Sequence, residues 1–478
     1  MIRTVALSAV VVGCALWGVA QTPETESGTR DADPAPAGGP PYALRVDRAD
    51  VTVRFSARLD TPEVSAFTVP AEAAAAVPVR LQIASDGGRI VASRPTEIPP
   101  ERRLRISVVV PATAGVSVEG SQLRVDAAPS VDDQLEEHGD APLMPLHLLL
   151  DSSDVVASGI GPVAVQATAT TITLDGCRGD VRVGLSDGDL RVVGHTGRLT
   201  TELAMSRFHL EDHTGRVEFH LAGGALTGIG AEGEVVGTAD DATVELDSIR
   251  GKVVAEGSRS TVIVRGTSGS QVQLSGRELT IFVEDCGADL LLTMVMGSAD
   301  VQEVGGRVLV DARDGAEVEL EQLGRGAAVI LRSSAGLRVT GAPDGTIQGN
   351  VEDAVVELEE VAWVDLAASR SEVVLRDVAQ IKRMDLVDST LSGWLPRLHG
   401  NPAVKLSGVS EAMLDVPMPC RVRVAGPGAR GASSAVSVSG CDLHSTGRTW
   451  GPASRGRPVL NLTATVGADS RLTVNGAL

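Results

Sequence analysis

Apolar and polar residues alternate along most of the chain, in short runs separated by Gly, Pro and Asp. The first such runs are Val46–Arg58, Val77–Ser85 and Arg102–Pro111. Because successive side chains of a β-strand point to opposite sides, this alternation predicts strands with one buried face. Residues 43–127 are therefore predicted to form a small all-β module.

Glycine recurs every 18 residues in the middle of the chain. Glycine accounts for 53 of 478 residues, which is too few for nine to fall in register by chance. A fixed period of this length is the signature of a repeat fold. The nine positions are Gly161, Gly179, Gly197, Gly215, Gly233, Gly251, Gly269, Gly287 and Gly305.

Each repeat unit carries two pairs of apolar residues at fixed distances from its glycine. In the unit that starts at Gly179, the pairs are Val181 with Val183 and Leu190 with Val192. The spacing of two within a pair places both side chains on the same side of a strand. Each coil of about 18 residues therefore holds two short strands, which predicts an all-β, parallel β-solenoid (β-helix).

The solenoid is predicted to span residues 143–425. The spacing loosens after Leu323, but strand-like apolar pairs continue. Residues 128–142 are acidic and are predicted to link the first module to the solenoid. Residues 426–478 are predicted to form a loop followed by capping strands, with a final hairpin in Val459–Gly476.

The first residues are typical of a secretory signal peptide. Arg3 precedes the apolar run Val5–Val12, and the small residues Gly18–Ala20 would precede the cleavage site. The sequence therefore predicts a signal peptide over residues 1–20. We expect an exported protein, located in the periplasm, at the cell surface or outside the cell.

A lipoprotein signal is an alternative at the same place. Val11–Cys14 resembles such a signal, in which Cys14 would carry the lipid anchor, although Ala15–Ala20 stays apolar where the tether is usually polar. Residues 21–42 are rich in Pro, Gly and polar residues and are predicted to be a disordered leader. No other run approaches the ~20 apolar residues that span a bilayer.

Composition and charge limit the classes of partner that the protein is expected to bind. Hydrophobic residues make up 43% of the chain but aromatic residues only 2%, so we expect a core of Val, Leu, Ile and Ala and no broad aromatic platform for carbohydrate. The net charge of -20 argues against nucleic acid and anionic lipid, because both require clustered Lys and Arg. An unidentified cell-surface protein or glycan remains as the expected partner.

Three sequence features suggest a family. They are the strand that ends at Val110–Pro111, the segment VSVEGSQLRV at Val116–Val125, and the G-x-V-x-V units from Gly179 onward. Over residues 43–425 the chain resembles a bacterial adhesin-like family with head-GIN-like or autotransporter-adhesin-like β-solenoids. This resemblance implies an exported, non-enzymatic protein of the cell envelope, with a structural or binding role. The acidic insertion at 128–142 departs from the family's usual pattern.

Two other classes of protein use similar coils. Polysaccharide lyases or hydrolases of the pectate-lyase-like β-helix type need long loops that wall a groove, whereas eight successive units here have no insertion. We therefore predict no enzymatic activity and no cofactor. Self-assembling filaments of the bactofilin type have coils of similar length, but the signal peptide argues against that class.

Two groups of residues could bind a ligand. The irregular segment Gln380–Pro402 contains Trp394, Arg397 and His399, which form either a ligand-binding patch or a loop that covers the coils. The second group consists of Cys177, His195 and His213.

Cys177, His195 and His213 each lie 16 residues after the glycine of their unit, which predicts that they stack on consecutive coils ~4.8 Å apart. Thiolate and imidazole bind Zn or Cu, and His209 or Asp212 could complete such a site. The alternative is a turn column that accepts polar residues. On balance no metal is predicted.

The predicted solenoid also fixes the distances between cysteines and therefore which of them can form a disulfide. Cys177 and Cys286 are separated by about six coils, or ~29 Å, and are predicted to remain thiols. Cys420 and Cys441 are 21 residues apart, about one coil plus a short loop, so their Cα atoms can approach to disulfide distance. An oxidising compartment then favours one disulfide, Cys420 to Cys441.

Overall fold

The computed structural model describes residues 42–56, 58–59, 63–69, 77–78, 82–86, 89–93, 103–130, 145–425, 436–445, 448–450 and 460–476. All of them belong to one compact unit, Pro40–Leu478. The predictions for the signal peptide, for Cys14 and for nearly all of the leader lie outside the described residues. So does most of the acidic segment 128–142.

Every regular element of the described residues is a β-strand. The first group is β1 (Tyr42–Arg45), β2 (Ala49–Ser56), β3 (Glu63–Val69), β4 (Val77–Pro78), β5 (Gln82–Asp86), β6 (Arg89–Ser93), β7 (Arg103–Pro111), β8 (Val116–Ser121) and β9 (Arg124–Pro129). The next is β10 (Leu146–Asp151), β11 (Asp154–Ser158), β12 (Val163–Thr168), β13 (Thr171–Asp175), β14 (Val181–Ser186), β15 (Asp189–Val193), β16 (Thr196–Glu211), β17 (Thr214–Ile229), β18 (Glu232–Asp247), β19 (Arg250–Ser258) and β20 (Thr261–Thr267).

The second half of the chain continues in the same way. Its strands are β21 (Gln271–Cys286), β22 (Asp289–Val304), β23 (Val308–Arg313), β24 (Glu317–Leu323), β25 (Gly326–Arg332), β26 (Gly336–Glu352), β27 (Val355–Ser369), β28 (Glu372–Arg376), β29 (Gln380–Val387), β30 (Thr390–Trp394), β31 (Ala403–Ser407) and β32 (Glu411–Val416). The last are β33 (Cys420–Ala425), β34 (Val436–Ser439), β35 (Asp442–Ser445), β36 (Arg448–Trp450), β37 (Leu460–Val466) and β38 (Arg471–Gly476).

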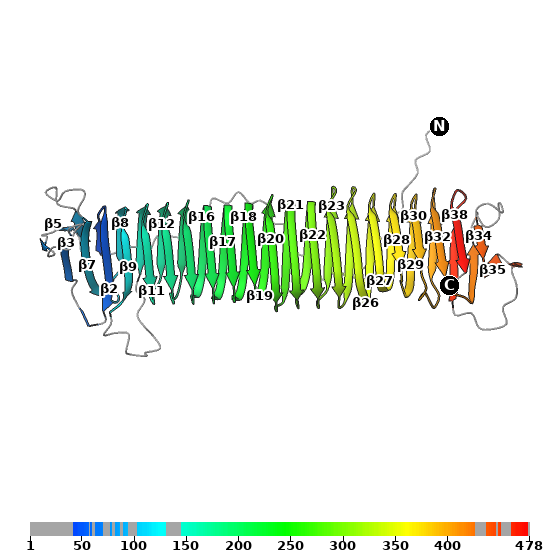
Figure 1. Ribbon diagram of the computed structural model, residues 1–478, viewed down its shortest axis with the longest axis horizontal. Helices are drawn as coiled ribbons and strands as arrows, with labels where there is room; N and C mark the ends of the chain where they lie inside the picture. Colours follow the sequence, from blue (N-terminus) through cyan, green and yellow to red (C-terminus); the bar gives the residue numbers. More distant parts are fainter. Residues whose placement is uncertain are drawn as a thin grey trace, which may run out of the picture. The chain divides into compact units, whose positions relative to one another are not determined.

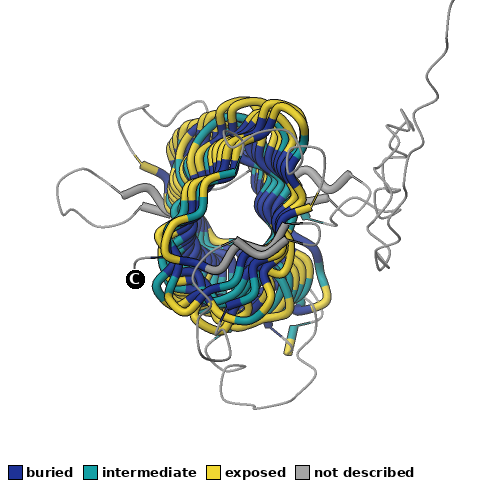
Figure 2. Tube along the Cα trace, turned by 90° about the vertical axis from the view of Figure 1, so that its right-hand side faces the viewer, coloured by how far each residue is buried: buried dark blue, intermediate teal, exposed yellow. Residues whose placement is uncertain are grey.

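The strands form a parallel β-solenoid of about 15 turns with roughly 18 residues per turn, which confirms the predicted fold (Figure 1). Each turn contributes one strand to each of two faces. The first face contains β10, β12 and β14, and the second face contains β11, β13 and β15. Seen along the stack, the coils superimpose as one oval (Figure 2). Long strands such as β16 run from one face around a corner onto the other.

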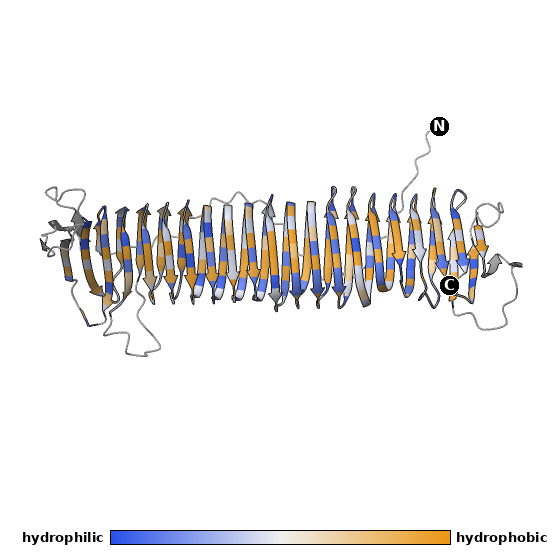
Figure 3. Ribbon diagram, in the orientation of Figure 1, coloured by the Kyte–Doolittle hydropathy of each residue, from blue (hydrophilic) through white to orange (hydrophobic). Residues whose placement is uncertain are grey.

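Alternation of apolar and polar residues builds the core. Inward-facing residues such as Val181, Val183, Leu190 and Val192 are buried, whereas their neighbours Arg182 and Arg191 face solvent. The same alternation recurs along the coils (Figure 3). Full burial of a Val or Leu side chain contributes about 1.5–3 kcal/mol, so repetition over the coils stabilises the stack.

Small residues line the first corner, which follows the strand of the first face. The buried hydroxyls of Ser206 and Ser260 accept hydrogen bonds from the backbone N–H groups of Gly188 and Ala242 on the preceding coil. Each hydroxyl also donates to a carbonyl two residues earlier in its own coil. These serines therefore fasten consecutive coils while their own polar groups stay satisfied.

After the second corner, glycines of consecutive coils lie in close backbone contact with one another. A Cβ atom added to Gly197, Gly215, Gly233, Gly251 or Gly269 would collide with the carbonyl oxygen of the preceding glycine of the column. This close backbone approach explains why the repeat keeps glycine there.

The last two glycines of the 18-residue series do not belong to this column. Gly257 pairs with Gly276, so this coil has 19 residues and shifts the pattern by one position. Gly287 accordingly lies beside Thr267, and Gly305 beside Gly287. The prediction of one continuous glycine column was wrong for these two residues.

The N-terminal strands stack directly on the later coils. β8 pairs in parallel with β10, and β9 pairs in parallel with β11. The stack therefore continues on both sides of segment 128–142. At the N-terminal end, β3 pairs with β7 in the antiparallel direction.

The C-terminal strands do not form the predicted hairpin. β37 and β38 run parallel to their neighbours and form a regular coil of the stack. Alternation shows that a segment is a strand but not which strand it pairs with, which is the reason for the error. At this end of the stack, β35 and β36 pair in the antiparallel direction.

Candidate functional site

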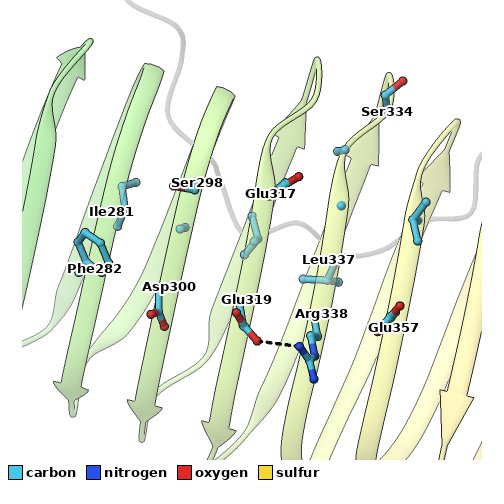
Figure 4. A pocket seen from close by; sticks show the side chains of 15 residues that line it. Ile281, Phe282, Ser298, Asp300, Glu317, Glu319, Ser334, Leu337, Arg338 and Glu357 are labelled. Carbon is cyan, nitrogen blue, oxygen red and sulfur yellow. Dashed lines mark ion pairs between the residues drawn. The ribbon is translucent and has the colours of Figure 1, made fainter.

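A hollow of the stack lies on the second face, across β21, β22, β24, β26 and β27 (Figure 4). It has a volume of about 520 Å³. Phe282 lies at one end of the hollow, and Val355 contributes to its rim; both side chains are exposed. The hollow is thus formed by strand residues of successive coils and by Ser334 and Ala335 of the short turn before β26, and not by inserted loops.

One column of outward-facing residues runs across the hollow. Phe282 pairs with Asp300, Asp300 with Glu319, Glu319 with Arg338, and Arg338 with Glu357. Neighbouring parallel strands hold such residues ~4.8 Å apart. The strand register therefore fixes an ordered row that begins with an aromatic ring and continues with charged groups.

Carboxylates dominate the electrostatics of the hollow. Arg338 forms an ion pair with Glu319 at 3.4 Å, and the Gln302 side-chain amide donates a hydrogen bond to Asp300. No described residue forms an ion pair with Glu317 or Glu357. With four carboxylates and one guanidinium in the lining, the hollow favours neutral or positively charged ligands over anions.

Two smaller hollows lie on the same face. One, of about 270 Å³, adjoins the 520 Å³ hollow and shares Phe282 and Asp300 with it. The other, of about 290 Å³, lies further toward the N-terminus, at Arg191, Arg207 and His209.

Sequence analysis singled out His209, which borders one of the smaller hollows, as a possible metal ligand, but it did not single out the residues of the 520 Å³ hollow. Outward-facing positions follow no period, because solvent accepts almost any polar residue. The one available signal was Phe282, an aromatic residue at a position that the alternation assigns to the outer side. Its side chain is 43% exposed.

The structure does not bring Trp394, Arg397 and His399 together around a pocket. Trp394 ends β30 and is 52% exposed on the second face. Arg397 forms an ion pair with Asp377 at 2.6 Å, and His399 contacts the Gln380 side chain. None of the hollows described above includes these three residues.

Cys177, His195 and His213 do lie on consecutive coils, at the second corner. The backbone N–H groups of Thr196 and Thr214 donate to the carbonyls of Cys177 and His195. All three side chains are buried, so they belong to the interior and not to a solvated turn. The Nδ1 atoms of the two histidines are 3.0 Å apart.

The hydrogen bonds of the histidine pair fix its tautomers. His195 Nε2 lies 3.0 Å from the Gly179 carbonyl oxygen, which can only accept, so this nitrogen carries a proton. In the neutral ring, His195 Nδ1 must then accept from the Nδ1–H of His213. His213 Nε2 is left as a buried, unprotonated nitrogen, and it has no hydrogen-bond partner among the described residues.

Burial disfavours charge in this column. It lowers the pKa of His213 to about 4, with a smaller contribution from His195, and it also lowers the pKa of His195. Burial raises the pKa of the Cys177 thiol to about 11 and also raises that of Cys286. Cys177 instead directs its sulfur toward the carbonyls of Ala157 and Asp175.

No group of three or more His, Cys, Asp or Glu side chains in the described part of the chain is arranged to hold a metal ion. His209, the possible additional ligand, faces outward beside Glu211, at 3.5 Å. Cys177 and Cys286 are free thiols, whereas Cys420 and Cys441 form a disulfide with Cα atoms 5.0 Å apart.

The fold and these features define a class: an all-β repeat protein with an open hollow on one face, acidic and partly aromatic in its lining. No protein-family model matches the chain, and comparisons with curated proteins and with solved structures found no match. Within the described ranges, no helix is long and apolar enough to span a membrane.

Proposed function

We propose that the chain is an exported, non-enzymatic β-solenoid that serves as a structural or adhesin-like binding surface of the cell envelope. The observation that carries this proposal is the 520 Å³ hollow on the second face. Within residues 145–425, the longest connection between strands is Leu395–Pro402, and it does not line the hollow. An open hollow of this kind supports docking more than catalysis, which requires walls that exclude water.

The partner would be a cell-surface protein or glycan with neutral or positively charged groups. Phe282 offers a face for apolar or sugar CH groups, and Asp300, Glu317 and Glu357 offer acceptors for hydroxyl or ammonium donors. The chain's net charge of -20 would attract a cationic partner over a distance. We therefore expect binding to weaken with added salt.

Antiparallel strands at both ends support a discrete scaffold over a filament. β3 covers one side of β7, and the pair β35–β36 covers β33. End-to-end growth of a parallel stack requires free parallel edges. A single species in ultracentrifugation of the mature chain would agree with a scaffold, and end-to-end polymers would favour the filament.

The test is a binding screen of purified protein against envelope glycans and envelope proteins, followed by two matched variants. Phe282→Ser removes the exposed ring from the hollow, and Leu309→Ser changes a similarly exposed apolar residue, 39% accessible, on the first face. We expect Phe282→Ser to weaken binding at least tenfold and Leu309→Ser to leave it unchanged. Equal effects would contradict the assignment of the binding face.

Release of products from pectin, alginate or other acidic glycans would contradict the non-enzymatic part of the proposal. Such activity should be sought with and without calcium. Loss of the activity in Arg397→Ala or His399→Ala variants would then assign it to the segment that contains Trp394.

A further inference from the structure

The coil formed by β37 and β38 lies out of chain order. β37 pairs in parallel with β31 on one side and with β33 on the other, on the first face. β38 likewise pairs with β32 and β34, on the second face. The coil β37–β38 therefore separates two coils, β31–β32 and β33–β34, that follow each other directly in the sequence. We call the space between these two coils the slot.

The inserted coil fits the slot through apolar side chains and through polar bonds on both sides. The Asn475 amide donates to Asp415 at 2.9 Å, and its oxygen accepts from the Ser439 hydroxyl at 3.0 Å. The Ser470 hydroxyl donates to the Gly408 carbonyl at 2.9 Å. Its inward-facing apolar side chains are all buried: Leu460, Leu462, Ala464, Val466, Leu472 and Val474.

The disulfide lies against the end of the inserted coil. A Cβ atom added to Gly476 would lie 2.6 Å from Cys441 Sγ and 3.0 Å from Cys420 Sγ. Cys420 begins β33, so the bond closes the coil that covers β37 and β38. The inserted coil can leave only when this covering coil moves.

The edges on the two sides of the slot are compatible with each other. β31 and β33 both run parallel to β37, and β32 and β34 both run parallel to β38. If the inserted coil left, β33–β34 could therefore stack directly on β31–β32, as consecutive coils do elsewhere in the molecule. The strand directions on the two sides of the slot are therefore as compatible with a closed slot as with the filled slot of this structure.

We propose that the slot is an exchangeable binding site for a two-strand β-coil. The protein's own Leu460–Gly476 fills it in this structure, and the same segment of a second copy can replace it. Recognition rests on backbone pairing with four strand edges, on apolar residues at the inward positions and on glycine beside the disulfide. This proposal is independent of the binding face proposed above.

The experiment uses the full chain with a protease site placed between Trp450 and Leu460. After cleavage, the folded protein is mixed with a fluorescent peptide of residues 459–478, and uptake is followed by anisotropy. We expect the cleaved protein to take up the peptide, and uptake to be at least tenfold faster once the Cys420–Cys441 disulfide is reduced. The uncleaved chain, in which the tethered segment competes, should take up far less.

Two peptide variants provide the matched control. Leu462→Asp with Val474→Asp places charges at inward positions and should abolish uptake. Thr463→Asp with Thr465→Asp adds the same charge at exposed positions and should leave uptake unchanged. Equal uptake of both variants would overturn the proposal, and so would no uptake of the native peptide by the cleaved, reduced and still folded protein.

Hydrogen exchange of the intact chain gives an independent measurement. We expect the amides of β33, β34, β37 and β38 to exchange together, earlier than those of β28 and β30. Reduction of the disulfide should accelerate exchange in the first group only. Exchange of β37 and β38 only together with the whole stack would contradict the proposal.

Discussion

The rings of His195 and His213 stack inside the solenoid, with centroids 5.0 Å apart and planes inclined by 14°. One ring thus lies above the other on consecutive coils, in a column that continues with apolar residues. Ile160 and Cys177 precede the pair, and Ala231 and Ile249 follow it, all buried. The pair is the part of this interior column that can gain a proton and become positively charged.

We predict that the free energy of unfolding falls as the pH falls from about 6.5 to 4. His213 is neutral in both states above this window, and within it only the unfolded chain gains the proton, because the pKa of the folded state is lowered to about 4. A shift from 6.5 to 4 corresponds to a loss of about 3 kcal/mol. The free energy of unfolding, measured with urea at several pH values, tests this prediction.

The control for this prediction is a pair of variants. His195→Leu with His213→Leu should weaken the pH dependence between about 6.5 and 4, because leucine suits the apolar column. His209→Gln, which changes a histidine on the outer side, should leave it unchanged. A double-leucine variant as pH-dependent as the native protein would refute the assignment.

The glycine column predicts a sharp contrast between two alanine substitutions. Gly251→Ala would drive Cβ into the Gly233 carbonyl and should destabilise the protein by about 2 kcal/mol or more. Gly305→Ala, whose nearest neighbour would be the Gly287 Cα at 3.8 Å, should change stability by less than ~0.5 kcal/mol. Thermal melts compare the two. Similar losses would mean that the backbones do not approach as described.

The direction of side chains predicts a second contrast, between neighbouring residues of β14. Val183 is buried, so Val183→Asp should cost several kcal/mol as an unpaired buried charge. Arg182 faces solvent, so Arg182→Asp should cost less than about 1 kcal/mol. Denaturant unfolding checks both. Equal tolerance at the two positions would refute the two-strand coil.

The thiols should resist modification until the stack opens. Cys177 and Cys286 are buried, and their raised pKa values keep them protonated at neutral pH, so a maleimide should label neither in the folded protein. Peptide mapping should find a single bridge, Cys420 to Cys441. A linkage between Cys177 and Cys286 within one chain would be incompatible with the stacking order.

The repeat could be predicted from the sequence because each coil has the same few residue types at the same positions. Val181, Val183, Leu190 and Val192 sufficed to predict two strands and their inner sides. The 19-residue coil between Gly257 and Gly276 could not be predicted from the sequence. The reason is that Gly287 follows Gly269 by 18 residues, so the glycine series continues by coincidence.

Pairing partners and outward-facing sites were less predictable. Alternation in Leu460–Gly476 indicates strands, but a hairpin and an inserted parallel coil have the same pattern. The row from Phe282 to Glu357 exists only through strand register, which places residues from five coils side by side. The equal spacing of Cys177, His195 and His213 from their repeat glycines predicted that they stack on consecutive coils. The sequence did not predict that their side chains are buried.

Ion pairs on the outside of the stack also join one coil to the next. Arg216 contacts Glu218 at 2.7 Å and Glu234 at 3.1 Å, Arg198 contacts Glu218 at 2.8 Å, and Lys252 contacts Glu234 at 3.5 Å. The hydrogen bond from Arg198 lowers the pKa of Glu218. Exposed pairs of this kind contribute about 0–1 kcal/mol each.

Because each coil touches only the coil before it and the coil after it, the middle of the molecule acts as a spacer. Removing or duplicating one whole coil, for example residues 215–232, would leave both ends and their strands intact. Each such change would alter the distance between the two ends by ~4.8 Å. The length of the solenoid can therefore vary in small, equal steps without any change of its fold.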